Sequence, residues 1–164
     1  MNSKRIATNA FLIALTIIIL YLNIILPIST ISILTLSSAF IPIALIRNSI
    51  KDAFLVYISS SIISFFLLPL NIVLLYICFF GIYGIVKYFI EKINNITFEI
   101  ILKLLFFNFI LIIGFLILKS FLPINLIKIP IWLFIVLSQI IFLIFDYALT
   151  LLISFYLEKI HKKS

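Results

Sequence analysis

The feature that most constrains this chain is a succession of six apolar runs, most of which are long enough to cross a bilayer. A hydrocarbon core of ~30 Å needs about 20 apolar residues per α-helix. The runs are separated by short polar or proline-containing breaks, and they lack the alternating polar and apolar pattern of barrel strands. The sequence therefore predicts an all-α polytopic membrane protein, with one transmembrane domain over 1–164 and helices at approximately 6–26, 31–46, 53–68, 72–90, 100–118 and 131–157.

Composition agrees with this class and excludes two others. Hydrophobic residues make up 66% of the chain and charged residues only 10%, whereas a soluble domain carries roughly 25% charged residues. Intrinsic disorder requires low hydrophobicity together with high net charge, so it is excluded as well. The net charge of +7 would suggest a nucleic-acid partner in a soluble protein. In a membrane protein it reflects topology, and we expect no nucleic-acid binding.

The positions of the basic residues predict the orientation of the helices. Only Lys119 and Lys128 lie on the side opposite to the termini. Ten basic residues lie on the side that holds both termini, namely Lys4, Arg5, Arg47, Lys51, Lys87, Lys92, Lys103, Lys159, Lys162 and Lys163. Basic residues concentrate in cytoplasmic loops, so this asymmetry predicts cytoplasmic termini and a multi-pass protein of the cell membrane.

Three breaks share the pattern Leu-Pro-[Ile/Leu]-[Ser/Asn], at positions 26–29, 68–71 and 122–125. Proline cannot continue a helix, and Ser or Asn can cap the next one. The three segments fall after the first, third and fifth predicted helices. We therefore expect hairpin turns on one side of the membrane, facing outward.

The sequence offers few residues that could bind a metal or form a disulfide. It contains a single cysteine, Cys78, and a single histidine, His161, whereas disulfides need pairs and zinc sites need clustered ligands. Nucleotide-binding loops, serine-nucleophile motifs and paired catalytic acids are also missing from the sequence. We expect no metal, no cofactor and no enzymatic activity.

Polar residues inside the apolar runs are the candidates for function, because an ionisable group at mid-bilayer costs at least ~2.5–3.5 kcal/mol on insertion scales. Asp146 is the only acidic residue deep in a run, and Asn108 is expected at a similar depth. Gln139 and Thr150 extend the Asp146 face of the last helix. This stripe is interpreted either as one wall of a substrate cavity or as hydrogen-bonding groups that hold helices together. Lys103 could be a partner of Asp146 by snorkelling, but Glu99, four residues earlier, is its nearer expected partner.

Small and hydroxylated residues in the second, third and fourth runs are interpreted as helix-packing positions, because they let helices approach closely. They are Thr35, Ser38, Ser60, Ser64, Gly81 and Gly84. Tyr76 and Tyr83 are seven residues apart on one helix face, where they are suited to line a cavity.

The first helix carries a small-residue face. Its segment 4–15 begins Lys-Arg and contains Ala10-x-x-x-Ala14, and Ala7 extends the same face by one turn. Such a face lets another helix pack closely. This segment resembles the first helix of the substrate-binding S components of energy-coupling factor (ECF) transporters, which begins with basic residues and an Ala-x-x-x-Ala motif.

The resemblance implies a six-helix protein of a prokaryotic plasma membrane with cytoplasmic termini. It would dock through Ala7, Ala10 and Ala14 on a transmembrane coupling subunit that works with cytoplasmic ATPases. It would also bind a small molecule, such as a vitamin, near the outward turns. From position and polarity alone, we expect the site to be bounded by Asn71, Tyr76, Asn108, Gln139 and Asp146.

Two other functions remain open at this point. A membrane scaffold resembling MreD of the cell-wall elongation machinery would have the same number of spans and would use its polar stripe to contact partner helices. An enzyme acting on lipid-linked substrates would need a paired acid and base, which the sequence does not offer.

Overall fold

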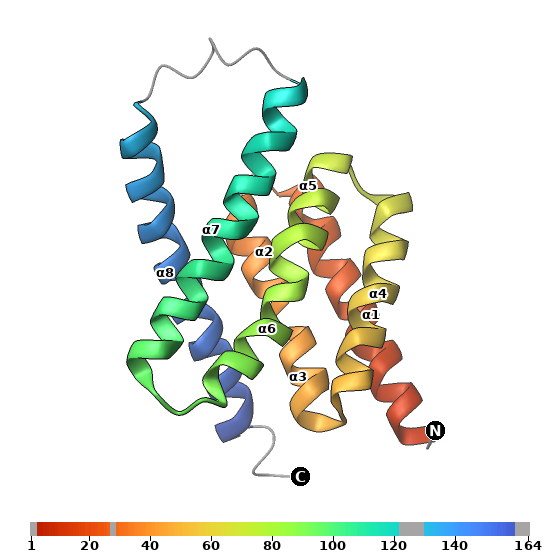
Figure 1. Cartoon of the computed structure of the whole chain (residues 1–164). Helices are drawn as coiled ribbons and strands as arrows, with labels where there is room; N and C mark the ends of the chain where they lie inside the picture. Colours follow the sequence, from red (N-terminus) through yellow and green to blue (C-terminus); the bar gives the residue numbers. More distant parts are fainter. Residues whose placement is uncertain (1–2, 27–28, 122–129, 160–164) are drawn as a thin grey trace. The chain divides into compact units, whose positions relative to one another are not determined.

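The structure is a computed structural model that describes residues 3–26, 29–121 and 130–159, and it contains only helices over these residues (Figure 1). The elements are α1 (Ser3–Ile25), α2 (Thr30–Ser38), α3 (Phe40–Arg47), α4 (Ile50–Leu67), α5 (Leu70–Leu75), the π-helical η1 (Tyr76–Phe80), α6 (Gly81–Glu91), α7 (Ile96–Phe121) and α8 (Ile131–Lys159).

Over the described residues, six helical stretches are long and apolar enough to cross a membrane, which confirms the predicted all-α fold with six candidate spans. Four of them lie within single helices. They are α1, α4, the segment Ile96–Leu116 of α7 and the segment Trp132–Glu158 of α8. The remaining two combine short helices, α2 with α3 over Thr30–Arg47, and α5 with η1 and α6 over Leu70–Glu91.

Local chemistry explains where the second stretch is interrupted. Pro42 lacks an N–H group, so the carbonyl of Ser38 has no donor four residues later and the α-helical ladder is broken there. Ala39 bridges α2 and α3 in an α-helical conformation and donates its N–H to the carbonyl of Leu36 three residues back. The helix therefore tightens at this point without ending.

The third predicted helix begins earlier than the sequence analysis placed it. It was expected to start at residue 53, after a polar break, but α4 begins at Ile50. Ser49 is its N-cap and accepts the backbone N–H of Asp52 at 3.4 Å. Asp52 follows Ser49 by three residues, the spacing of a capping box, and the Ser49 hydroxyl satisfies one backbone donor of the first helical turn. Residues 50–52 thus belong to the helix.

Of the three Leu-Pro turns, the one at 68–71 lies wholly within the described residues and does separate two helices. Its N-cap is Pro69, however, and Asn71 is the second residue of α5, so the expected cap by Asn71 is wrong. The segment 26–29 is described only at its two ends, and 122–125 lies outside the described residues.

The chain divides into two compact units, Met1–Phe89 with Ala148–Ser164, and Ile90–Tyr147. In the first unit, α1 packs against α2, α3 and α4 (Figure 1). Its core contains the buried apolar side chains of Leu12, Leu20, Leu34, Ile41, Ala44, Val56 and Val73. The assignment of one transmembrane domain to 1–164 stays a prediction.

Hydroxylated and small residues fill close contacts inside the first unit. Thr35, Ser38, Ser60 and Ser64 are buried and donate to carbonyls of their own helices, as expected for packing positions. At Gly84 an added Cβ would lie 2.6 Å from the Cδ atom of Pro42, and at Gly81 it would lie 2.7 Å from the Tyr57 ring. Both glycines are therefore required by close helix contacts.

Replacement of Gly84 by alanine is expected to lower the free energy of unfolding by about 1–3 kcal/mol, because the added methyl group overpacks the contact with Pro42. Thermal unfolding in detergent micelles measures this loss. Gly114→Ala is the matched control, since an added Cβ at Gly114 meets nothing within 4 Å. Equal unfolding midpoints for the two variants would contradict the close contact at Gly84.

Candidate functional site

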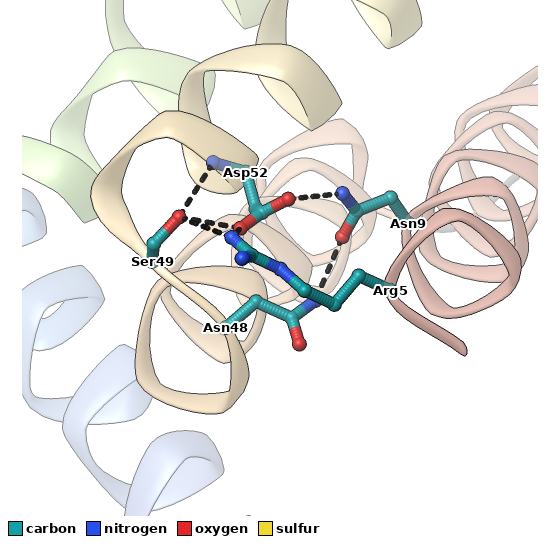
Figure 2. A network of polar contacts seen from close by, with 5 residues as sticks. All are labelled: Arg5, Asn9, Asn48, Ser49 and Asp52. Carbon is teal, nitrogen blue, oxygen red and sulfur yellow. Dashed lines mark hydrogen bonds and ion pairs between the residues drawn. The ribbon is translucent and has the colours of Figure 1, made fainter. Parts of the chain in front are cut away.

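A polar network joins the first turns of α1 to the turn between α3 and α4 (Figure 2). The Arg5 guanidinium donates through Nη2 to Ser49 Oγ at 2.9 Å and to the carboxylate of Asp52. Asn9 Nδ2 donates to the other Asp52 oxygen at 2.6 Å, and Asn48 Nδ2 donates to Asn9 Oδ1 at 3.0 Å. Asn9 and Asp52 are each only 2% exposed. The buried charge of Asp52 is thus satisfied by Arg5, Asn9 and the Ser49 hydroxyl.

The sequence analysis treated 47–52 as a polar break and missed this network. Two signals for it were present. Arg5 and Asn9 are four residues apart and therefore share one face of α1. Ser49 and Asp52 have capping-box spacing, which places the carboxylate at the start of a helix. Neither signal predicts that the two pairs meet, because that depends on how α1 packs against α4.

In the second unit, α7 and α8 share a polar seam. Lys103 Nζ lies 2.8 Å from Glu91 Oε1 and 3.0 Å from Asp146 Oδ2. Further along, Gln139 Nε2 donates to Asn108 Oδ1 at 2.8 Å. Positions rise along α7 while they fall along α8, so the two helices pair antiparallel.

An aromatic contact separates the two polar contacts of this seam. The rings of Phe107 and Phe142 are stacked, with centroids 4.5 Å apart and an interplanar angle of 11°. Stacked rings of this kind add to helix pairing beyond the area that they bury. The seam therefore alternates polar, aromatic and polar contacts.

These contacts change two expectations for the last helix. Asn108 was expected at the level of Asp146, but its partner is Gln139, about two turns away on α8. For Lys103, Glu99 was the nearer expected partner and Asp146 the alternative, and the structure brings its ammonium group to Asp146 and to Glu91. Thr150, the third member of the expected stripe, accepts from Lys87 Nζ at 2.8 Å in the first unit. Gln139, Asp146 and Thr150 thus each meet a group on another helix.

The other two candidate substrate residues lie in the first unit and have different surroundings. Tyr76 is fully buried, and its hydroxyl lies 2.8 Å from Ser60 Oγ. Asn71 is exposed near the start of α5. Tyr83, the other tyrosine of that face, is also fully buried.

Tyr76 opens the π-helical segment η1, in which the backbone hydrogen bonds are displaced by one residue. Tyr57 Oη donates at 2.8 Å to the carbonyl of Ile77 within this segment. Insertions of this kind are frequent at functional sites. An open apolar pocket of ≈ 380 Å³ lies beside it, lined by Ser61, Ile62, Phe65, Phe66 and Ile77.

The small-residue face of α1 points away from its own bundle. Ala7, Ala10 and Ala14 are all exposed. The opposite side of the helix is buried, at Asn9, Leu12, Thr16 and Leu20. The three alanines are therefore available to a helix of another protein or to lipid.

Over the described ranges, no group of three His, Cys, Asp or Glu side chains is arranged to hold a metal ion. Comparison with known proteins adds no further assignment. No protein-family model matches this sequence. No curated protein matches it. No solved structure matches it either.

Proposed function

We propose that this chain is a substrate-capture subunit of a prokaryotic plasma membrane, similar to the S components of ECF transporters. It would bind a small molecule from outside and present it to a transmembrane coupling subunit and cytoplasmic ATPases. The observation that carries this proposal is the exposed face of Ala7, Ala10 and Ala14 on α1. A row of small side chains lets a partner helix approach the backbone closely, and this row does not contact its own bundle.

The remaining support comes from the span count and the charge pattern. Six membrane-length helices match the number that the resemblance implies. The excess of basic residues on one side supports cytoplasmic termini, which would place the Leu-Pro turns outside.

For the substrate, the five polar residues named from the sequence are taken as candidates in each unit by itself, Asn71 and Tyr76 in the first and Asn108, Gln139 and Asp146 in the second. Asn71 is exposed, and so its amide is free to contact a ligand. Gln139 Oε1 is buried and has no hydrogen-bond partner among the described residues, which leaves an acceptor for a ligand N–H or O–H group. Asn108, Asp146 and Tyr76 already bind other side chains, so a ligand would have to exchange hydrogen bonds with them.

A second candidate function is a membrane scaffold resembling MreD. The observation that favours it is the pairing of Asn108 with Gln139 and of Lys103 with Asp146, because these contacts use the polar seam to join helices. A scaffold would need the exposed alanine face of α1 for a partner, but it would need no substrate and no ATPase.

Substitution of Ala10 by tryptophan is expected to weaken partner docking roughly 5–150-fold, because overpacking a close helix contact costs about 1–3 kcal/mol. Co-purification from native membranes through a tag on this chain, followed by identification of the retained proteins, measures the effect. Leu105→Trp is the control, because Leu105 is 60% exposed on α7 and lies far along the chain from the alanine face.

The expected result is that a coupling subunit and an ATPase are recovered with the unmodified chain. They should be lost only in Ala10→Trp. Recovery of a membrane partner without any ATPase would favour the scaffold. If the retained proteins are the same for both tryptophan variants, the alanine face is not the docking surface.

A further inference from the structure

Three other basic residues are sequence neighbours of the polar network formed by Arg5, Asn9, Asn48, Ser49 and Asp52. Lys4 precedes Arg5 on α1, Arg47 precedes Asn48 at the end of α3, and Lys51 precedes Asp52 on α4. Consecutive Cα atoms are 3.8 Å apart, so each of these residues stays beside a member of the network. Hydrogen bonds tie the network members together (Figure 2), so the backbones of Lys4, Arg47 and Lys51, from three helices, lie at the same end of the first unit.

The charges of these three residues are not compensated within the described chain. Lys4, Arg47 and Lys51 are exposed, and none forms an ion pair with a described residue. The acid nearest to them in sequence is Asp52, whose carboxylate is buried and already accepts from Arg5, Asn9 and Ser49. With Arg5 and Asp52 cancelling each other, the cluster has a surplus of three positive charges.

The position of the cluster points to the kind of anion that it meets. Lys4 is the second residue of the span formed by α1, Arg47 is the last residue of the span Thr30–Arg47, and Lys51 is the second residue of the span formed by α4. Side chains at the ends of membrane spans lie at the depth of lipid headgroups. Basic pockets between transmembrane helices at this depth bind the phosphates of anionic lipids.

We propose that Lys4, Arg47 and Lys51 form a binding site for the phosphate headgroup of an anionic membrane lipid. The network supplies the rigidity of the site, because Asp52 and Asn9 fix the ends of α1 and α4 before any lipid binds. The site does not depend on the proposed transport function and would serve a scaffold equally well.

Native mass spectrometry of the full chain tests this site. The protein is purified in a neutral detergent and supplied with equal amounts of phosphatidylglycerol and phosphatidylcholine that carry the same acyl chains. A preference for phosphatidylglycerol is expected for the unmodified chain. Each neutralised cation is expected to weaken headgroup binding about fivefold, so the triple variant Lys4→Gln/Arg47→Gln/Lys51→Gln should lose on the order of 100-fold of this preference.

The control removes the same number of charges elsewhere, as Lys92→Gln/Lys119→Gln/Lys128→Gln, and should keep the preference. Equal lipid binding by the unmodified chain and the triple variant would overturn the proposal, and so would equal losses in the two triple variants. Glycerol phosphate that binds the site as tightly as phosphatidylglycerol does would show that the site takes a free phosphate instead. Loss of a co-purifying acidic protein, with lipid binding unchanged, would assign the surface to a protein partner.

The comparison of the two lipids on the unmodified chain does not depend on any variant. Arg5, Asn9 and Asp52 stay in place in the triple variant, and the three substituted side chains are exposed, so the fold is expected to be retained. If phosphatidylcholine binds the unmodified chain as well as phosphatidylglycerol does, the site is excluded without further experiments.

Discussion

Asp52→Ala is expected to lower the free energy of unfolding by about 1–3 kcal/mol, the usual cost of leaving a buried hydrogen-bonding group without its partner. The substitution leaves the Arg5 guanidinium without its carboxylate, and it leaves the buried Asn9 amide without its acceptor. It also removes the side-chain partner of the Ser49 hydroxyl. Unfolding of the purified chain in detergent micelles, induced by heat or by a denaturing detergent, measures the loss.

Two further variants separate the charge of Asp52 from its position. Lys51→Ala lies in the same helical turn but removes an exposed side chain, so its effect should stay within about 0.5 kcal/mol. Asp52→Asn keeps an oxygen that can accept from Asn9. Its loss in the free energy of unfolding should therefore lie between those of Asp52→Ala and Lys51→Ala. If Asp52→Ala is no more harmful than Lys51→Ala, the network does not join α1 to α4.

Lys103→Met is expected to have the second large effect, a loss of about 3 kcal/mol in the free energy of unfolding. The substitution keeps the length of the side chain but removes the ammonium group that meets Glu91 and Asp146, so two carboxylates lose a buried partner. Lys92→Met is the matched control, because Lys92 is exposed and should tolerate the change. The same unfolding measurement in micelles applies.

A double-mutant cycle with Asp146→Asn tests whether the two residues act on each other. Residues in direct contact show coupling energies of about 0.5–3 kcal/mol, so the double variant should be more stable than the sum of the single losses implies. Additive losses would contradict a direct Lys103–Asp146 contact.

The same Asp146→Asn chain separates the two interpretations of this carboxylate. Weaker ligand binding at unchanged stability supports a substrate wall, and lower stability with unchanged binding supports a role in joining α7 to α8.

The six spans were predictable because each depends only on local composition. Apolar runs of membrane length and the breaks between them are properties of short windows, and the described residues include a helix of suitable length and hydropathy at each of the six. The start of α4 was misplaced by three residues because Lys51 and Asp52 are charged and looked like part of a loop. The Ser49–Asp52 capping arrangement, which is also a local signal, explains why these charges belong to the helix.

The polar contacts were less predictable, because they join residues far apart in the chain. The polarity of Asp146, Asn108 and Gln139 marked them correctly as residues that need a partner. Their actual partners depend on the relative shift of α7 and α8, which no periodicity in either helix determines. The contact between Arg5 and Asp52 was missed for a different reason. Charges at helix ends are usually solvated, and only the packing of α1 against α4 buries this carboxylate.

The order of residues in the α7–α8 seam also has a consequence for membrane insertion. Helices enter a membrane in the order in which they are synthesised, and an isolated charge at mid-bilayer is expensive. Glu91 precedes Lys103 by twelve residues, so the ammonium group has a carboxylate nearby when α7 enters. Asp146 follows 43 residues later, when Lys103 is already in place to receive it. Lys103 and Asp146 are thus each synthesised after an oppositely charged residue with which they pair.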